Sequence, residues 1–452
     1  MDEQQRKAFL VERKRLAGPN SSVFFEENPL IVTSAKGQYL FEEDGERFLD
    51  CISNVQHVGH SNEVVAAAVA EQFRLTSCNV RFLNPVVNDC CRQLLAHCPP
   101  SIDCVLFCNS GSEANDLALR LARDYTSGKD VVVLNHAYHG HLQSCMEVSP
   151  FKFNKIQKGT YHSDFVHVAA LPDTYRGSFG SDASAYALDV ERLIKERVVA
   201  AGAGHKLSAF IMESLVSCAG QIIPPAGYLD QVARVVRAHG GLVIVDEVQT
   251  GFYRSGRHFW AYRCHAAEDF EPDIITCGKP MGNGFPVSAV LTSKKIAARL
   301  ADGVEYFNTF AGNPVACRAT LATLKVLEQD NLRENAAIVG EYFLNKLCVF
   351  QRKFPKVVGD VRGVGLFIGI EFIRPTEGES GIQANSELAK LIVYHCRNKR
   401  NIILNFDGPD SNVIKIKPPM CFSKENADEV IDALTECLTL HESGQADANG
   451  RT

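Results

Sequence analysis

Short apolar runs alternate with amphipathic stretches through the middle of the chain. The stretch SEANDLALRLARDY (112–125) has a helical pattern and follows the first of these runs. Each run is short and mostly apolar, which predicts a buried strand. The alternation predicts a mostly parallel sheet with helices on both faces. The predicted strands are VLFCN (105–109), DVVVLN (130–135), AFIMES (209–214), GLVIVDE (241–247) and DIITCG (273–278).

The two chain ends have a different pattern. Residues 30–50 predict short antiparallel strands, with an Asp-Gly turn signal in EEDGE. From about residue 318 a long helical stretch, 319–347, gives way to mixed strands and helices. We therefore expect an α/β fold with one large domain and a smaller α+β domain built from both ends. The predicted boundaries are 1–55 and 318–440 for the small domain, 56–317 for the large domain and 441–452 for a disordered tail.

Composition excludes several classes of protein. The 452 residues are 46% hydrophobic and 22% charged, with a net charge of −6, which is typical of a soluble globular protein. The sequence has no basic stripe, so we expect no nucleic-acid partner, and no apolar run long enough to span a membrane. The 16 cysteines are scattered without a C-x-x-C pair, which favours reduced thiols. Asp2, Glu3 and Glu12 argue against a mitochondrial presequence and favour an ordinary N-terminal helix.

Candidate chemistry gathers where predicted strands end, the edge at which open α/β sheets bind ligands. In CNSGSEAND (108–116) a strand ends, Ser110, Gly111 and Ser112 form a turn, and a helix begins. The free N–H groups of a helix start favour an anion, although the same residues could be a simple helix cap.

The segment HAYHGH (136–141) follows another strand. Tyr138 offers an aromatic face on which a planar ring could stack, although a loop aromatic is more often packed. The histidines lack the spacing of zinc modules, so we expect no metal site.

Two charged residues end the remaining strands. Asp246 closes a buried run, where a carboxylate is costly unless a cation or several donors meet it; a helix cap or a buried arginine is the alternative explanation. Lys279 follows a strand and precedes a glycine-rich loop. Burial would lower the pKa of its amine and free it as a nucleophile and base.

A glycine pair in RGVGLFIGIEF (362–372) precedes an apolar run instead of opening a helix, which excludes a nicotinamide site. The other features together describe one ligand, pyridoxal phosphate. The turn 110–112 would hold its phosphate and Tyr138 would stack on its ring. Lys279 would form the Schiff base, and Asp246 would pair with the ring nitrogen.

The chain from about residue 24 to 440 resembles the class III aminotransferases, a branch of the fold-type I pyridoxal phosphate enzymes. The motifs NSGSEAN, AYHG, DEVQTGF, the Lys279 segment, NTFAGNP and VRGVGLF occur in the family's order. The resemblance implies that Gln249 bonds the ring hydroxyl, Val248 packs behind the ring, and Glu213 lies at the rim of the site. It also implies a homodimer or a tetramer, in which Thr309 reaches the cofactor phosphate of the neighbouring subunit.

Departures from the family pattern point to a lyase. Members usually carry an arginine for a substrate carboxylate where IKIKPPM has Lys415, and the two cations are not interchangeable. The segments around Asn54 and Arg81 resemble the eukaryotic phospho-lyase subgroup, whose members act on phosphoethanolamine or 5-phosphohydroxylysine and are mitochondrial.

This resemblance implies β-elimination of phosphate, with Asn54, Arg81 and Lys415 around the substrate phosphate. Surface or inter-subunit ion pairs are the alternative for these residues. An ω-aminotransferase is the alternative activity, and the cytoplasm is the alternative compartment.

Overall fold

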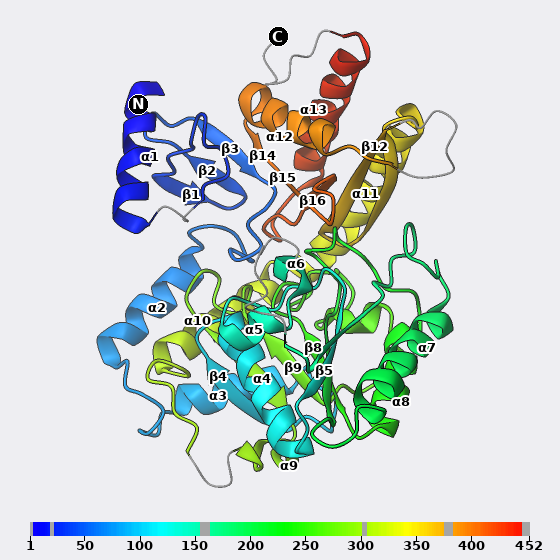
Figure 1. The fold of residues 1–452 in the computed structure, drawn as a ribbon. Coiled ribbons are helices and arrows are strands. Elements are labelled where there is room, and N and C mark those ends of the chain that lie inside the picture. The colour runs from blue at the N-terminus through cyan, green and yellow to red at the C-terminus, as the bar shows by residue number, and fades with distance from the viewer. Residues whose placement is uncertain (1–2, 19–21, 154–162, 301–304, 375–382, 445–452) are drawn as a thin grey trace.

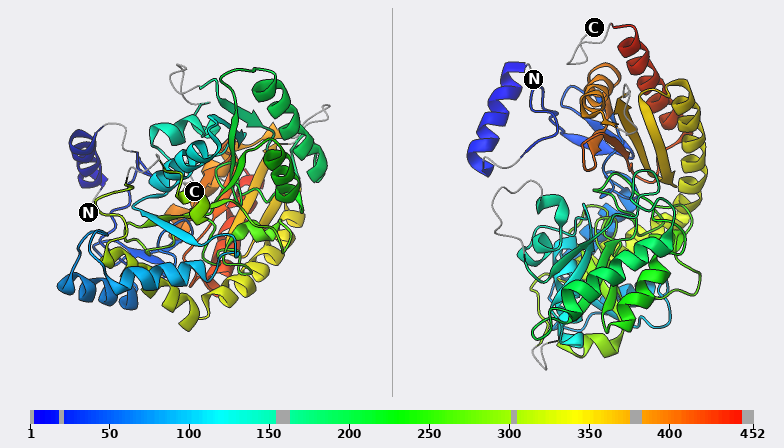
Figure 2. Two further views of the ribbon diagram at one scale, coloured as in Figure 1. Left: turned by 90° about the horizontal axis from the view of Figure 1, so that it is seen from below. Right: turned by 45° about the vertical axis from the view of Figure 1, so that its right-hand side comes forward.

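The computed structural model describes residues 3–18, 22–153, 163–300, 305–374 and 383–444. Figure 1 shows the middle of the chain as the lower body of the molecule, with both chain ends above it. In the right view of Figure 2 the N-terminal strands and the C-terminal helices lie together at one end of that body.

The central sheet has seven strands in the order β4-β10-β9-β8-β7-β5-β6. Strands β6, β5, β7, β8 and β9 pair in parallel, whereas β10 is antiparallel to both β9 and β4. The predicted mostly parallel α/β sheet is confirmed, but the sequence pattern missed β6 and β10. The bounds are β4 Cys104–Cys108, β5 Asp130–Leu134, β6 Val166–Ala169, β7 Leu207–Glu213, β8 Leu242–Asp246, β9 Ile274–Cys277 and β10 Ser288–Thr292.

Helices cover both faces of this sheet. Strands β5 and β7 to β10 are buried along their whole length, which explains their nearly continuous apolar sequences. Neighbouring residues of β5 face opposite ways: Val131 and Val133 pack in the core around α4, whereas Val132 and Leu134 pack in the core that contains α7 and α8. These helices are α4 Gly111–Thr126, α7 Ala183–Leu193 and α8 Tyr228–Ala238.

Both chain ends contribute to the smaller unit. Strand β14 pairs in parallel with β3, with Ile402 opposite Leu49, so the C-terminal part completes the N-terminal sheet β1-β2-β3-β14. A second sheet has the order β11-β12-β16-β15, and β13 pairs with β12. The domain boundaries at 55 and 317 stay predictions. The strands are β1 Ser34–Lys36, β2 Tyr39–Phe41, β3 Arg47–Asp50, β11 Val358–Val364, β12 Phe367–Arg374, β13 Gln383–Ala384, β14 Ile402–Ile403, β15 Asn405–Asp407 and β16 Val413–Ile416.

The remaining helices differ from prediction in two places. The stretch 319–347 is two helices, α10 and α11, because Asn331 between them adopts a left-handed φ of 50°. Helix α13 continues to Glu442, two residues into the predicted tail, and 445–452 lie outside the described residues. These helices are α1 Glu3–Ala17, α2 Glu63–Leu75, α3 Pro85–Leu95, α5 Gln143–Glu147, α6 Pro150–Phe153, α9 Lys294–Ala297, α10 Pro314–Gln329, α11 Leu332–Lys353, α12 Ser386–Arg400 and α13 Lys424–Glu442, with a π-helix at Ile194–Val199 and a 3-10 helix at Ala261–Cys264.

The glycine pair of RGVGLFIGIEF lies in the hairpin of β11 and β12, which agrees with rejecting it as a nucleotide loop. None of the helices in the described ranges is long and apolar enough to cross a membrane.

Candidate active site

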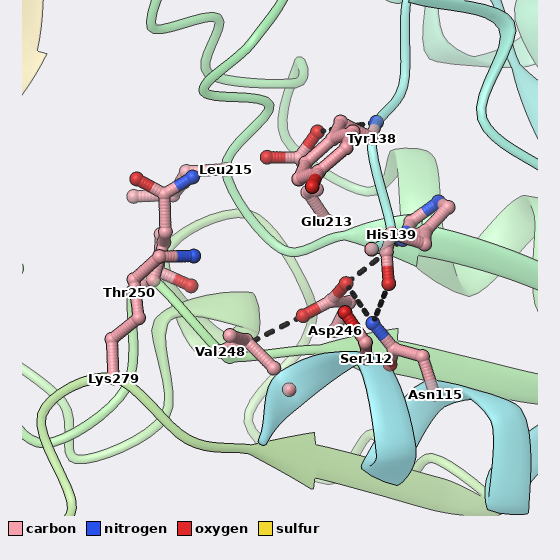
Figure 3. Close-up of a pocket in the computed structure, with 13 residues that line it drawn as sticks. Ser112, Asn115, Tyr138, His139, Glu213, Leu215, Asp246, Val248, Thr250 and Lys279 are labelled. Carbon is pink, nitrogen blue, oxygen red and sulfur yellow. Dashed lines mark hydrogen bonds and ion pairs between the residues drawn. The ribbon is translucent and has the colours of Figure 1, made fainter. Parts of the chain in front are cut away.

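A cavity of about 150 Å³ lies at the carboxyl ends of the parallel strands. Figure 3 shows its side chains, which come from the start of α4, the loop after β5, and the segments that end β7, β8 and β9. These segments are distant in sequence, so the sheet topology assembles the site. The lining residues are Gly111, Ser112, Asn115, Tyr138, His139, Gly140, Glu213, Leu215, Asp246, Val248, Gln249, Thr250 and Lys279.

The start of α4 forms one wall of the cavity. Ser110 is the N-cap, and its Oγ accepts from the backbone N of Glu113 at 3.2 Å. A Cβ on Gly111 would lie 2.5 Å from Cγ1 of Val248, so only glycine lets the helix begin this close to β8. The helix therefore points its first N–H groups and its positive dipole end at the cavity.

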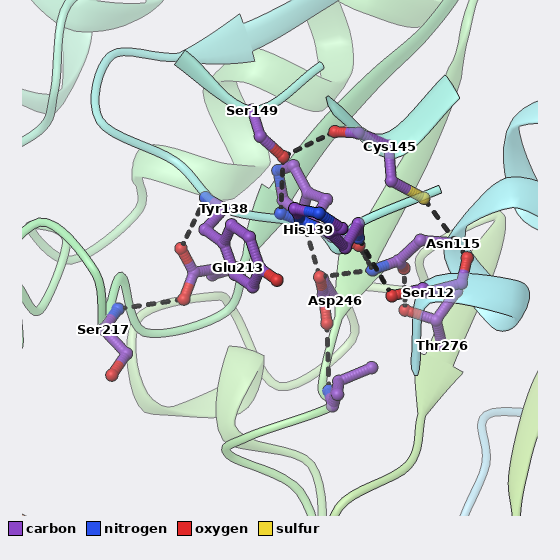
Figure 4. Close-up of polar contacts among 12 residues, drawn as sticks. Ser112, Asn115, Tyr138, His139, Cys145, Ser149, Glu213, Ser217, Asp246 and Thr276 are labelled. Carbon is purple, nitrogen blue, oxygen red and sulfur yellow. Dashed lines mark hydrogen bonds and ion pairs between the residues drawn. The ribbon is translucent and has the colours of Figure 1, made fainter. Parts of the chain in front are cut away.

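Asp246 is buried and meets three hydrogen-bond donors (Figure 4). Its Oδ1 accepts from the backbone N of Val248 at 3.0 Å. Its Oδ2 accepts from Asn115 Nδ2 at 2.7 Å and from His139 Nδ1 at 2.8 Å. Hydrogen bonds to the charged form stabilise a buried carboxylate, which explains how an acid can end this strand. No buried arginine takes part in the contacts that the structure gives for this carboxylate.

Asn115 and His139 were not predicted from the sequence. Asn115 also donates to the backbone O of His139 at 2.8 Å, and its Oδ1 accepts from Thr276 at 2.6 Å, so it ties α4, β9 and the loop after β5 to the carboxylate. Both residues lie inside segments already singled out, NSGSEAN and HAYHGH. In the described part of the chain no group of three potential metal ligands includes a histidine of HAYHGH.

Lys279 lines the same cavity as Asp246, on the side away from His139 and Asn115 in Figure 3. Burial lowers the pKa of its amine below the ordinary value, although the negative charge of Asp246 opposes this shift. The fraction of neutral amine at neutral pH therefore increases, which favours nucleophilic attack and proton abstraction.

Glu213 is a second buried carboxylate at the end of β7. Its Oε1 accepts from the backbone N of Tyr138 at 3.2 Å, and its Oε2 accepts from the backbone N of Ser217 at 3.1 Å. Burial raises the pKa of Glu213 to about 7. Glu213 therefore changes charge near neutral pH beside the cavity. It also fixes the loop that carries Tyr138. The Tyr138 ring packs edge-on against the Phe151 ring, with 6.2 Å between the ring centroids.

Gln249 connects the cavity to the smaller unit. Its Oε1 accepts from Asn54 Nδ2 at 3.2 Å and from Ser217 Oγ at 3.4 Å. No hydrogen bond from its Nε2 is found among the described residues, so this nitrogen is available to a ligand. Asn54 in turn accepts from Lys417 Nζ at 3.4 Å. Lys417, which follows β16, was not singled out in the sequence analysis.

Lys415 is buried and donates to Asp407 Oδ2 at 2.5 Å. Burial alone would lower the pKa of Lys415, but Cys218 and Asp407 raise it, and the net shift is upward. Lys415 is therefore a charged, paired lysine within Coulombic reach of Lys279, whose pKa it helps to lower.

Five predicted residues are not among those that line this cavity. Ser110 caps the helix that forms one wall, and Asn54 and Lys415 make the contacts given above. The other two are Arg81 and Thr309. Arg81 forms a bidentate pair with Glu305 at 3.0 and 2.8 Å and lies over the ring of Phe307. Thr309 is exposed beside Phe310. Both were predicted for a phosphate, Thr309 across a subunit boundary, and these roles stay predictions.

The residues present fit the predicted cofactor. The start of α4 offers N–H groups to a phosphate, Asp246 offers an oriented carboxylate to a ring nitrogen, and Lys279 offers an amine of lowered pKa to an aldehyde. Tyr138 and Val248 offer an aromatic and an aliphatic surface to a flat ring. Each of these assignments is a prediction about a ligand that would occupy this cavity.

Comparison with known proteins agrees with the prediction that this site binds pyridoxal phosphate. Residues 23–438 match the family described as aminotransferase class-III. The chain is 45% identical to "ethanolamine-phosphate phospho-lyase homolog 1" of Caenorhabditis elegans, over 97% of this chain and 95% of that protein. It is also 45% identical to "alanine–glyoxylate aminotransferase 2-like" of Drosophila melanogaster, over 94% of this chain and 86% of that protein. The human "alanine–glyoxylate aminotransferase 2, mitochondrial" is 32% identical over 95% of this chain and 85% of its own length.

Solved structures include a phospholyase from Arthrobacter in complex with phosphoethanolamine. It is 35% identical, with a TM-score of 0.87 over 95% of this chain and 99% of that chain. An amine transaminase from an uncultivated Pseudomonas species, in a form with bound pyridoxal phosphate, is 27% identical, with a TM-score of 0.78 over 93% of this chain and 97% of that chain.

Proposed function

This chain belongs to the class-III aminotransferase family of pyridoxal phosphate enzymes, and from that premise we propose that it is a phospho-lyase. The proposed reaction is the β-elimination of phosphate from a phosphorylated amino alcohol. Phosphoethanolamine is the favoured substrate, giving acetaldehyde, ammonia and phosphate. The worm relative named as a phospho-lyase homolog and the phosphoethanolamine complex of the Arthrobacter phospholyase support this choice.

One observation favours elimination over transamination. Lys415 occupies the position at which we expect an arginine for a substrate carboxylate, and its charge is shared with Asp407 at 2.5 Å. A lysine bonded in this way lacks the planar fork that binds a carboxylate through two parallel hydrogen bonds. The site is therefore poorly suited to the keto acid that a transaminase needs as its second substrate.

Pyridoxal phosphate, when bound, supplies an electron sink that stabilises negative charge on the carbon next to the substrate nitrogen. Asp246 would keep the ring nitrogen protonated, and Asn115 and His139 would hold that carboxylate in place. Gly111 and Ser112 would present N–H groups to the cofactor phosphate, and Gln249 would donate to the ring hydroxyl.

Lys279 would take the proton from the carbon bearing nitrogen, since burial lowers the pKa of its amine. The C–O bond to phosphate on the adjacent carbon then breaks, and its electron pair leaves on the phosphate oxygen. The resulting enamine reacts with water to give acetaldehyde and ammonia. Cationic side chains on the small-unit side of the cavity would stabilise the departing phosphate.

A second activity has specific support. The fly and human relatives are named as alanine–glyoxylate aminotransferases, which makes an ω-aminotransferase the alternative. The substrate 5-phosphohydroxylysine is the alternative within the lyase class.

The test is phosphate release from phosphoethanolamine and from 5-phosphohydroxylysine by the cofactor-loaded protein, without any keto acid. A lyase releases phosphate continuously from its substrate under these conditions. If amino transfer from alanine to glyoxylate proceeded while neither phosphate ester was consumed, the aminotransferase would replace the lyase. Lys279→Ala is the matched inactive control.

The proposal extends to a homodimer, or a tetramer of such chains. Leu83 is 100% exposed, and Phe82 and Phe310 are 66% and 71% exposed. They lie on two segments that meet where Arg81 covers Phe307, beside Thr309. An apolar surface of this kind favours burial against another protein surface. A second copy would cover it and place Thr309 at the subunit boundary.

We propose a mitochondrial location, which the name of the human relative supports, with the cytoplasm as the alternative. Fractionation of cells that express the untagged full-length protein distinguishes the two compartments.

A further inference from the structure

Lys417 lies beside the cavity, and no carboxylate of the described residues forms an ion pair with it. Its Nζ donates to the backbone O of Ile52 at 3.2 Å and to Asn54 Oδ1 at 3.4 Å. Within the described ranges it forms no ion pair. Lys415 is two positions earlier, in β16, and its charge contributes to the pKa shift of Lys417, so the two amines lie within Coulombic reach of each other. Since Lys415 is paired with Asp407, Lys417 is the amine of the two that is still available to a ligand.

Hydrogen bonds connect Lys417 to the cavity wall. Asn54, which accepts from Lys417, donates to Gln249, and Gln249 lines the cavity together with Lys279. The charge of Lys279 also contributes to the pKa shift of Lys417, so the two amines lie within Coulombic reach of each other. The Lys417 amine is therefore placed to attract an anionic group of a substrate that is bound in this cavity.

The surroundings of Lys417 favour its neutral form until an anion arrives. Burial, and then the charges of Lys415 and Lys279, lower the pKa of Lys417 to about 7. Two other groups affect the pKa of Lys417. They are the thiol of Cys218, which follows β7, and the guanidinium of Arg254, which follows β8. A bound dianion would reverse this balance, because an adjacent negative charge favours the protonated amine.

We propose that Lys417, held by Ile52 and Asn54, binds the phosphate group of the substrate, with the Lys415–Asp407 pair as a positioning element beside it. The inference deepens the proposed function and rests on it for the identity of the substrate. When the C–O bond breaks, the Lys417 ammonium neutralises the charge on the leaving phosphate. Lys417 thus makes the site selective for phosphorylated amines.

The test uses the cofactor-loaded protein and monoethyl phosphate, which has the ethyl phosphate part of phosphoethanolamine but no amine. At pH 8 this ester is a dianion, because the second pKa of a phosphate monoester is about 6. A lysine of pKa about 7 is then mostly neutral, so binding is expected to take up close to one proton. Calorimetry in buffers of different ionisation enthalpy measures both the affinity and this proton uptake.

Lys417→Met is expected to bind monoethyl phosphate about 10- to 100-fold more weakly, which corresponds to losing one charge-assisted contact. It is also expected to show no proton uptake. Lys417→Arg is expected to retain binding without proton uptake, because arginine is protonated at all relevant pH values. Lys356→Met, at an exposed lysine of the C-terminal part, should behave as the wild type.

Wild-type affinity in Lys417→Met, or proton uptake at pH 8 that persists in Lys417→Arg, would overturn the assignment. If Lys417→Met does not fold, the Lys417→Arg comparison still decides the question. The two proposals fail separately. A wild type that binds monoethyl phosphate through Lys417 but releases no phosphate from phosphoethanolamine refutes the lyase and keeps the anion site. Phosphate release with unchanged kcat/KM in Lys417→Met refutes the anion site alone.

Discussion

Asn115 allows the most detailed prediction, because its side chain makes three buried hydrogen bonds around Asp246. Its Nδ2 lies 2.7 Å from Asp246 Oδ2 and 2.8 Å from the backbone O of His139, and its Oδ1 accepts from Thr276. Asn115→Ala removes one of the three donors to the carboxylate and leaves the Thr276 hydroxyl unpaired. A hydrogen bond to a charged group contributes about 1.5–3 kcal/mol. The carboxylate would then be less firmly oriented toward the cavity.

We therefore expect Asn115→Ala to bind pyridoxal phosphate about 10- to 100-fold more weakly than the wild type. The assay is an absorbance titration of cofactor-free protein with pyridoxal phosphate, together with thermal unfolding of both forms. Thr276→Val is the matched control, because it removes the hydroxyl behind Asn115 and keeps all three donors to Asp246. Its affinity is expected to fall less than tenfold. Equal cofactor affinities in Asn115→Ala and the wild type would refute the role assigned to this donor set.

Four further predictions follow from the same structure. Glu213 has a pKa raised to about 7 by burial, so the wild type should lose stability as the pH rises from about 4.5 to 7. In thermal melts over this pH range, the stability of Glu213→Gln should decrease less than that of the wild type. Lys417 has a pKa lowered to about 7, so burying its charged amine destabilises the folded protein fully below pH 7. This destabilisation decreases as the pH rises to about 10.5. The gain in stability of Lys417→Met over the wild type should therefore be greatest at pH 6 and decline toward pH 10. Lys279→Ala should lose both the Schiff-base absorption and phosphate release, because no other amine is predicted to attach the cofactor. Leu83→Asp, at a fully exposed leucine, should convert the proposed dimer to monomers in light scattering, whereas an unchanged mass would count against that surface as the interface.

The sequence predicted the sheet well because buried parallel strands are apolar along their whole length. Strand β6 was missed because its VHVA alternates, with His167 buried in contact with Asp130. Strand β10 was missed because its small residues follow a glycine-rich loop, and its burial comes from pairing with β4 and β9. The helix break at Asn331 depends on a left-handed backbone that asparagine permits but does not require.

Within the candidate site, the sequence predicted those residues whose type alone suggests a chemical role. Asp246 and Lys279 stand out because a charge at the end of a buried strand needs an explanation, and both line one cavity. Asn115 and His139 were missed because an amide and an imidazole acquire their role only through the partner that the fold brings to them. Lys417 was overlooked beside Lys415, because only the contact of Lys415 with Asp407 reveals which of the two charges is already paired.

The most direct test of the central claim is the product stoichiometry for phosphoethanolamine over many turnovers, with pyridoxal phosphate and no keto acid. We predict one phosphate, one ammonia and one acetaldehyde for each substrate consumed, at a steady rate. Consumption that stops after one equivalent per active site and resumes only when glyoxylate or pyruvate is added would contradict it.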